Sequence, residues 1–203
     1  LEEALTNLEE IDDAVFQRWR LKVYLSLGYN HRSQCNYLDA EFYLKEALKL
    51  LRSTLPSTIA FETHICKENI YVMADATAIH QIVMNLCTNA AHAMRENGGR
   101  LEVLLTDIRI DHEADRKRYP DAKPGDYIRL RVADQGHGID PHHLHRIFDP
   151  FFTTKDPGKG TGLGLWVSHS IIAKMGGGIH VKNNPDKGAV FTVEIPIVIP
   201  EKK

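Results

Sequence analysis

The strongest constraint on the fold is the order of two hydrophobic periodicities along the chain. Segments with apolar residues every three or four positions, as on one helix face, alternate with segments that have the every-second-residue pattern of strands. The helical segments are 40–55, 76–95 and 163–175, and the strand segments are 101–110, 127–133, 179–181 and 189–199, with a hairpin or two short strands expected within 59–73. Because the last strands follow one another across turns, this order predicts an α+β sandwich, with one sheet covered by helices on one face, rather than a doubly wound βαβ fold.

The first 36 residues carry a pattern of their own. Apolar residues recur at three- and four-residue steps from Leu1 to Val23, which predicts one long helix ending near residue 32. A lone helix of this length would leave its apolar stripe in water, so we expect it to pack in a bundle, on a second copy of the chain or on the following domain. We expect residues 36–39 to be a short connector, and we divide the chain into a helix over 1–36 and a domain over 37–203.

The composition excludes several classes of function. The chain has 203 residues, 43% hydrophobic and 26% charged, which is the balance of an ordinary globular protein. Its net charge of -2 comes without a long block of one sign, which argues against a nucleic-acid surface. The three cysteines have no zinc or disulfide spacing, and no stretch approaches the roughly 20 apolar residues of a membrane span. We expect a cytoplasmic domain without membrane contact of its own, either free or as part of a membrane-anchored protein.

Two asparagines lie four residues apart in the helix predicted over 76–95, for which Asp75 is a suitable N-cap. Asn85 and Asn89 therefore share one helix face, while Ile82 and Leu86 belong to the buried stripe. Side-chain amide oxygens suit Mg²⁺, which keeps several waters and binds few protein ligands besides substrate phosphates. Taken alone, such a pair is more often an ordinary helix surface or a cap, so both interpretations stay open.

A carboxylate followed by glycines ends the strand predicted over 127–133. Asp134 is followed by Gly136 and Gly138 in the sequence VADQGHGI. A carboxylate here can accept the exocyclic amine of adenine, and glycines let the backbone lie against the base without Cβ contact. The alternative is a glycine turn after a strand, with the aspartate as a turn former.

Glycine occupies alternate positions in the sequence GKGTGLGL, just before the helix predicted over 163–175. The free backbone amides, the positive end of that helix and Lys159 together predict a cradle for phosphate oxygens. The order of residues matches neither a P-loop nor a dinucleotide-binding fingerprint. A merely flexible lid is the alternative.

Three aromatic residues stand close together just upstream, in the sequence IFDPFFTTK. Phe148, Phe151 and Phe152 would ordinarily belong to a core. Because a glycine-rich stretch follows them, they could instead anchor a mobile flap from which Lys155 reaches nucleotide phosphates.

These four segments, in this order, resemble the N, G1, F and G2 boxes of the catalytic domain of sensor histidine kinases. The resemblance covers about residues 40–199, and DPFFTTK with GTGLGL is particularly typical of the kinases. The wider ATPase superfamily includes gyrase, Hsp90 and MutL. The resemblance implies a Bergerat-type α/β sandwich, with a mixed, mainly antiparallel sheet, and ATP bound with Mg²⁺ between a helix and the flap.

The resemblance also implies roles for individual residues. Asn89 would be the Mg²⁺ ligand, with Asn85 lining the same site and Lys155 completing the catalytic set. Asp134 would bind the adenine amine, with Thr192 as a water-linked helper. The full ATP-binding set would be Asn89, His92, Asp134, Gly136, Gly138, Ile139, Phe148, Thr154, Lys155, Lys159, Gly160, Thr161, Gly162, Leu163, Gly164, Leu165 and Thr192.

The sequence departs from the kinases in lacking a suitable phosphoacceptor. Kinases of this kind carry a His followed by an acidic residue on the first helix of a dimerising hairpin. Here only His112 is followed by an acidic residue, Glu113, and this pair falls in a charged loop. The helix over 1–36 would then be the second helix of that hairpin and a possible homodimer contact. The expected partners are a phosphoacceptor hairpin supplied from elsewhere and the receiver domain of a response regulator.

Two further functions compete with the kinase. A gyrase-like ATPase or protein-serine kinase is the nearest, although gyrase-like members carry a water-activating Glu where Asn85 stands. A nucleotide-sensing module without catalysis is the other. His142, His143 and His145 also cluster as metal ligands would, but such surface clusters are mostly incidental.

Overall fold

The computed structural model describes residues 36–65, 71–111, 123–156 and 160–197. All of them belong to the unit Cys35–Lys203. The helix predicted up to residue 32, the pair of His112 and Glu113, and Lys159 lie outside the described residues. The elements in chain order are β1 Asn36–Asp39, α3 Ala40–Arg52, β2 Ile59–Ile65, β3 Tyr71–Ala74, α4 Ala76–Ala93, β4 Gly99–Ile110, β5 Gly125–Asp134, α6 Gly164–Lys174, β6 Gly178–Asn183 and β7 Ala189–Pro196.

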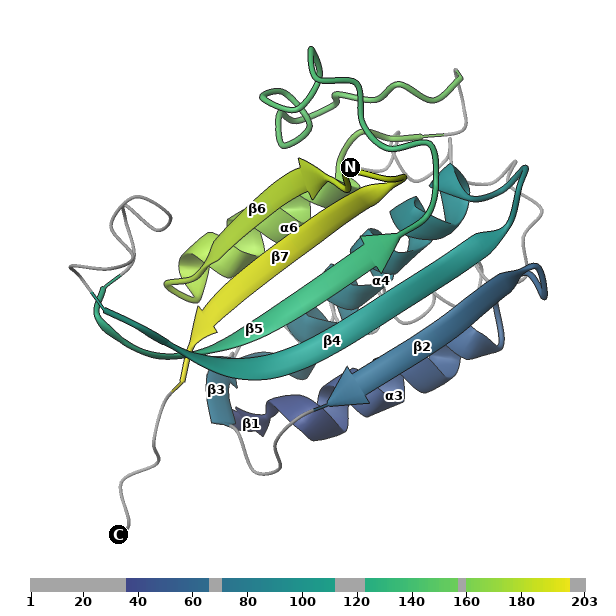
Figure 1. The fold of residues 1–203 in the computed structure, drawn as a ribbon. Helices are drawn as coiled ribbons and strands as arrows, with labels where there is room; N and C mark the ends of the chain where they lie inside the picture. The colour runs from purple at the N-terminus through teal and green to yellow at the C-terminus, as the bar shows by residue number, and fades with distance from the viewer. Residues whose placement is uncertain (1–35, 66–70, 112–122, 157–159, 198–203) are drawn as a thin grey trace, which may run out of the picture. The chain divides into compact units, whose positions relative to one another are not determined.

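The main sheet has five strands in the order β2-β4-β5-β7-β6, and α3, α4 and α6 lie along one of its faces (Figure 1). β2 runs parallel to β4, and every other neighbouring pair in this sheet is antiparallel. The predicted α+β sandwich with a mixed, mainly antiparallel sheet is therefore confirmed. Within the described part of the chain, no helix is long and apolar enough to cross a membrane.

One local prediction was wrong. Residues 36–39 are a strand, not a connector, because they pair antiparallel with β3 in a separate two-stranded sheet. Of the two alternatives for 59–73, the structure has two short strands and not a hairpin: β2 joins β4, and β3 joins β1. A parallel partner is reached only by a crossover connection, and here the connection from β2 to β4 runs through α4.

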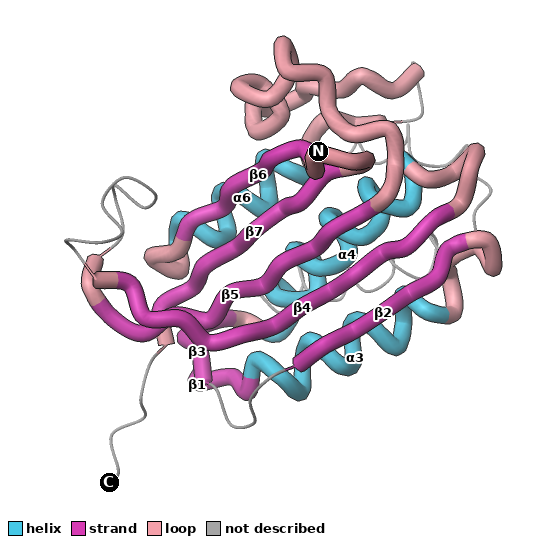
Figure 2. The backbone as a smooth tube through the Cα atoms, viewed as in Figure 1, coloured by secondary structure: helices cyan, strands magenta, loops and turns pink. Residues whose placement is uncertain are grey.

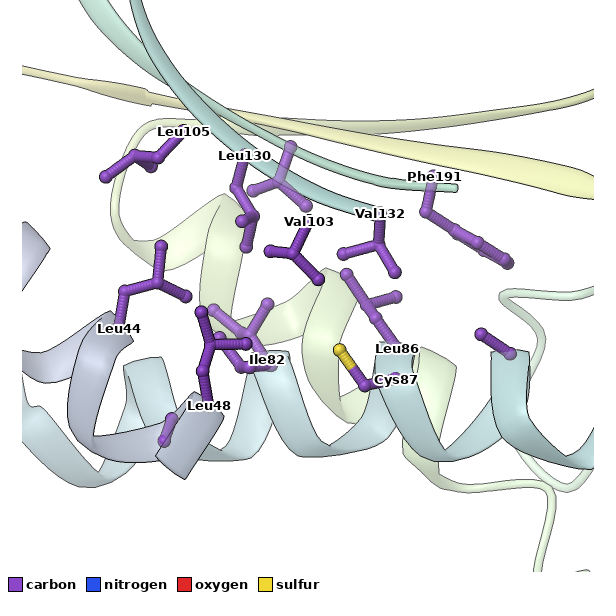
Figure 3. Packing of buried hydrophobic residues seen from close by; sticks show 14 of the residues in the cluster. Leu44, Leu48, Ile82, Leu86, Cys87, Val103, Leu105, Leu130, Val132 and Phe191 are labelled. Atoms are coloured by element: carbon purple, nitrogen blue, oxygen red, sulfur yellow. The ribbon is translucent and has the colours of Figure 1, made fainter. Parts of the chain in front are cut away.

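The core fills the space between the sheet and the helices. Leu44 of α3 points toward Leu105 of β4 and Leu130 of β5, and Leu86 of α4 points toward Val132 of β5 (Figure 3). Fully burying a side chain of this size contributes about 1.5–3 kcal/mol, so this layer fixes the faces of α3 and α4. Cys87 lies in the same layer, and its burial raises the pKa of the thiol to about 12.

The ends of α4 are set by specific residues. Asp75 has an extended backbone, and its Oδ1 accepts a hydrogen bond from the Thr77 amide at 2.7 Å, which confirms the predicted N-cap. At the other end the Gly98 amide donates to the Met94 carbonyl at 2.8 Å, and Gly98 has a φ of 62°. Both ends being fixed, the helix holds its polar face in a defined orientation.

Residues 135–156 and 160–163 follow β5 outside the sheet and consist mainly of turns and loops (Figure 2). This stretch and the start of α6 carry most of the predicted site residues. The main sheet and α4 therefore form the frame on which the site is built.

Candidate functional site

Asp134 is the last residue of β5 and is only 3% exposed. Its Oδ1 accepts hydrogen bonds from the Gly136 amide at 2.8 Å and the Ala189 amide at 3.3 Å. Burial raises the pKa of this carboxyl, and the two amides and the nearby His137 partly oppose the rise. Because both bonds fall on one oxygen and come from the backbone, the orientation of the carboxyl is fixed by the fold.

The glycines after Asp134 are required by close contacts. A Cβ on Gly136 would lie 2.5 Å from the Cβ of Ala93 on α4. Gly138 has a φ of 75°, and a Cβ there would lie 3.1 Å from Oδ1 of Asn183. The loop therefore passes between the end of α4 and the end of β6 with space for glycine only.

Asn183 and Gly188, at the two ends of the β6–β7 turn, hold this loop in place, and the sequence did not single them out as site residues. The side chain of Asn183 accepts from the Ile139 amide at 2.8 Å and donates to the Ile139 carbonyl at 2.6 Å, as a neighbouring strand would. Gly188 has a φ of 88°, and a Cβ there would overlap the carbonyl oxygen of Asp134. The turn signals in NNPDKG predicted the connection but not these contacts.

A cavity of about 210 Å³ adjoins Asp134. It is lined partly by Glu102 and Arg131, which form an ion pair at 2.7 Å and alternate along their strands with core residues. The cavity therefore opens on the sheet face opposite the helices. Asp134 lines it, but none of the predicted phosphate-binding residues does, so it is not the predicted phosphate site.

Asn85 and Asn89 of α4 make different contacts. Oδ1 of Asn89 accepts from the Lys155 ammonium at 3.2 Å. Nδ2 of Asn85 donates to the Gly164 carbonyl at 2.9 Å and to Oγ of Ser168 at 3.0 Å, both on α6. The structure thus brings Lys155 of the predicted flap to α4 and turns the amide of Asn85 toward α6.

Charges around Lys155 affect two pKa values. Lys155 is half-buried, and burial lowers the pKa of its ammonium. His92 lies one turn beyond Asn89 on α4, and partial burial, then the positive charges of Lys155 and Arg95, lower the pKa of its imidazole below 6.5. His92 is therefore mainly neutral at pH 7.

The three phenylalanines of the predicted flap do not share one environment. Phe148 and Phe152 are half-buried against the core. The ring centroid of Phe148 lies 5.5 Å from that of His169, and the ring centroid of Phe152 lies 5.4 Å from that of His143. Phe151 is 74% exposed and has a φ of 65°, which is uncommon for a residue other than glycine. Two of the three aromatics therefore anchor the segment, and the third faces solvent.

The glycine-rich stretch packs on this segment through two of its glycines. A Cβ on Gly162, whose φ is 66°, would overlap the backbone of Phe151. A Cβ on Gly160 would lie 2.7 Å from Oγ1 of Thr153 and 3.0 Å from Cδ of Lys155. The alternating glycines thus permit close packing of two loops as well as freeing backbone amides.

The other predicted residues fall into three groups. Thr154 and Thr161 are exposed, and Thr161 Oγ1 accepts from the Leu163 amide at 3.4 Å. Leu165 is partly buried against the core. Thr192 lies in the middle of β7 opposite Arg131, about 10 Å along the strand from the Ala189 amide that contacts Asp134. The structure therefore gives no support to Thr192 as a helper at Asp134.

The histidine cluster has packing contacts in place of a metal site. The backbone amide of His142 donates to Oδ1 of Asp140 at 2.8 Å, and the ring of His143 packs on Phe152. In the described ranges no group of three or more His, Cys, Asp or Glu side chains could hold a metal ion.

The chain is similar in sequence to known proteins. Residues 74–199 match the family described as histidine kinase-, DNA gyrase B- and HSP90-like ATPases. The two-component sensor PprA of Pseudomonas aeruginosa is 36% identical over 197 residues, which cover 96% of this chain and 20% of that protein. The sensor kinase CckA of Brucella abortus is 40% identical over 132 residues, covering 65% of this chain and 14% of that protein. The chain thus spans about a fifth or less of the length of these two curated relatives.

Solved structures share the fold. The catalytic domain of the histidine kinase ThkA matches with a TM-score of 0.64 at 31% identity, covering 79% of this chain and 94% of that one. The mycobacterial sensor histidine kinase MprB matches with a TM-score of 0.63 at 28% identity, covering 80% of this chain and 97% of that one. Sequence and fold agree, and the chain belongs to the family of histidine kinase-, DNA gyrase B- and HSP90-like ATPases.

Proposed function

We propose that this domain binds ATP and transfers its γ-phosphoryl group to a histidine on a phosphoacceptor hairpin, from which it passes to an aspartate of a response-regulator receiver domain. The observation that carries the proposal is the hydrogen bond between Lys155 and Asn89, because it brings a lysine of the flap to the polar face of α4. The names of the relatives support the two-component assignment.

The adenine is proposed to bind at Asp134. The carboxyl is buried and oriented through Oδ1, and a carboxylate accepts the hydrogen bond that the exocyclic amine of adenine donates. Gly136 and Gly138 let the backbone lie against the ring. The bonds from Asn183 to Ile139 keep this wall of the site in place.

The phosphates are proposed to lie between Lys155 and the backbone amides of residues 160–164. Those amides precede α6, whose N-terminal end favours negative charge. The Lys155 ammonium donates to Oδ1 of Asn89. The oxygens of a bound triphosphate carry more negative charge than this amide oxygen, so they would be stronger acceptors for the same ammonium. Lys159 belongs to the same proposed set.

The residues present fit Mg²⁺. Oδ1 of Asn89 already contacts one cation, the Lys155 ammonium, and Mg²⁺ prefers such oxygens together with waters and phosphates over a cage of protein ligands. When bound, Mg²⁺ would neutralise charge on the phosphate oxygens during phosphoryl transfer. Asn85 cannot act as a general base, so activation of water and ATP hydrolysis are disfavoured.

The wider assembly follows from the same assignment. We propose that residues 1–36 belong to the dimerising hairpin, that 37–203 form the catalytic domain, and that this domain works in the cytoplasm, where ATP is available. The acceptor histidine and the receiver domain would then both lie outside the catalytic domain.

Calorimetric titration with ATP and Mg²⁺ tests the first step. We expect saturable binding with one nucleotide per chain, and absence of binding would contradict the proposal. Adding a phosphoacceptor hairpin and assaying for acid-labile, base-stable phosphate tests the second step. Steady release of inorganic phosphate without a labelled histidine would favour a gyrase-like ATPase instead.

A further inference from the structure

A buried serine joins α6 to α4. Ser168 is 0% exposed, and its Oγ donates to the Gly164 carbonyl at 3.0 Å, one turn earlier on the same helix. The same Oγ accepts from Nδ2 of Asn85 at 3.0 Å, and Nδ2 also donates to the Gly164 carbonyl at 2.9 Å. Three groups, one on α4 and two on α6, thus form a closed triangle of hydrogen bonds.

The start of α6 has no cap of its own. Leu163 occupies the N-cap position and makes no side-chain capping bond, whereas α4 is capped by Asp75. Gly164 is the first residue of α6, so a bond to its carbonyl orients the first turn of the helix. A cap accepts hydrogen bonds from the amides of a first turn, whereas Ser168 and Asn85 donate to a carbonyl, so they do not cap α6 but tie its first turn to the second turn and to α4.

We infer that Ser168 and Asn85 are a positioning pair that holds the first turn of α6 against α4 and so orients the backbone amides of residues 160–164 toward the phosphates of the nucleotide. The inference rests on the proposed function and assigns Asn85 a role through α6 rather than through water or metal. The hydrogen bonds given above for both residues lie within α4 and α6, so the pair acts on the phosphates and not on the base.

Substitution of Ser168 has a matched control on the same helix. In Ser170 the hydroxyl also donates to the carbonyl one turn earlier, that of Trp166, at 2.9 Å. Ser168→Ala and Ser170→Ala thus remove the same kind of local bond, and of the two serines Ser168 is the one bonded to Asn85 of α4.

The experiment measures the affinities of both variants and the wild type for ATP and for AMP, with Mg²⁺, by calorimetry. Because one buried hydrogen bond is lost, we expect Ser168→Ala to lower the affinity for ATP about three- to tenfold and to change the affinity for AMP less than about twofold. Ser170→Ala should change neither affinity. Equal weakening of ATP and AMP, or no weakening of either, would overturn the inference.

Asn85→Ala provides the second variant if Ser168→Ala does not fold, as judged by its melting transition. Where all variants fold, the double variant should lose no more ATP affinity than Asn85→Ala alone, because Asn85→Ala already removes both hydrogen bonds between α4 and α6. Additive losses would overturn the pairing. Failure of the wild type to bind ATP at all would overturn the proposed function and the inference with it.

Discussion

The two ends of the proposed nucleotide site are held by different kinds of contact. At the base end, Asp134 is buried, its carboxyl is oriented by backbone amides, and Gly188 packs directly on its carbonyl. At the phosphate end, Phe151 is exposed, and side chains of α4 hold the loop and helix through Lys155 and Gly164.

This difference separates stability from affinity. Backbone contacts in and beside a sheet cannot change without disturbing the strands, so substitution of a glycine that makes such a contact at the base end acts on folding. Side-chain bonds across two helices can be removed one at a time, so substitutions at the phosphate end act mainly on binding. Four variants test this separation.

Gly188→Ala should have the largest effect. A Cβ there would overlap the Asp134 carbonyl at a φ of 88°, and conformational strain and overpacking together predict a loss of about 3–5 kcal/mol in the free energy of unfolding. Gly176→Ala is the control, because its φ is 73° but the nearest atom is 3.7 Å away. Urea unfolding should show a smaller loss there, and equal losses would mean that the contact with Asp134 is unimportant.

Asp134→Asn should lower the affinity for ATP more than about tenfold, or about 1.4 kcal/mol. The NH₂ group of the asparagine would face the base, and it donates a hydrogen bond where the carboxylate accepts one. The substitution should not lower stability at pH 7. The folded pKa of Asp134 is raised above 3.8, so its contribution to stability is present below 3.8 and is lost as the pH rises through the folded pKa. The stability of the wild type relative to the variant should therefore fall with rising pH in melting experiments, and the opposite slope would contradict the burial argument.

Gly162→Ala is the counterpart of Gly188→Ala at the phosphate end. Its Cβ would overlap the backbone of Phe151, but that residue lies in an exposed loop that can shift. We expect a loss of about 1–2 kcal/mol in stability, together with weaker ATP binding. A stability loss as large as that of Gly188→Ala would remove the distinction between the two ends.

Lys155→Met should have the smallest effect on folding, because the apolar stem is retained. ATP affinity should fall about five- to tenfold with AMP affinity unchanged, as for loss of one charge-assisted hydrogen bond. Removing the positive charge should also raise the pKa of His92 toward 6.5, which NMR titration of its ring protons measures. An unchanged pKa would show that the lysine does not act on His92.

The parts of the fold that local patterns determine could be predicted from the sequence. Periodicity indicated α4 and the β6–β7 hairpin, and Asp75 marked the start of α4. The pairing of Asn36–Asp39 with β3 and the parallel alignment of β2 with β4 could not be predicted, because strand partners depend on non-local contacts. The same limit applies to the site.

Asp134, Asn89 and Lys155 stood out because their residue types and neighbours carry chemistry. Asn183 and Ser168 did not, because each acts on a partner that is distant in sequence: Ile139 is 44 residues from Asn183, and Asn85 is 83 residues from Ser168. An asparagine in a turn and a serine in a helix are common, so their residue types alone gave no signal.

Residues 135–177, between β5 and β6, form a single excursion from the sheet that begins and ends at strands separated only by β7. For a flexible connection, the entropy of closure rises only with the logarithm of its length, about 0.6 kcal/mol for each doubling. Ile147 and Ile172 of this excursion belong to the core, so only its exposed turns can change in length without disturbing the core. Insertions or deletions in those turns can alter how quickly nucleotide enters and leaves the proposed site while the sheet and its core stay intact.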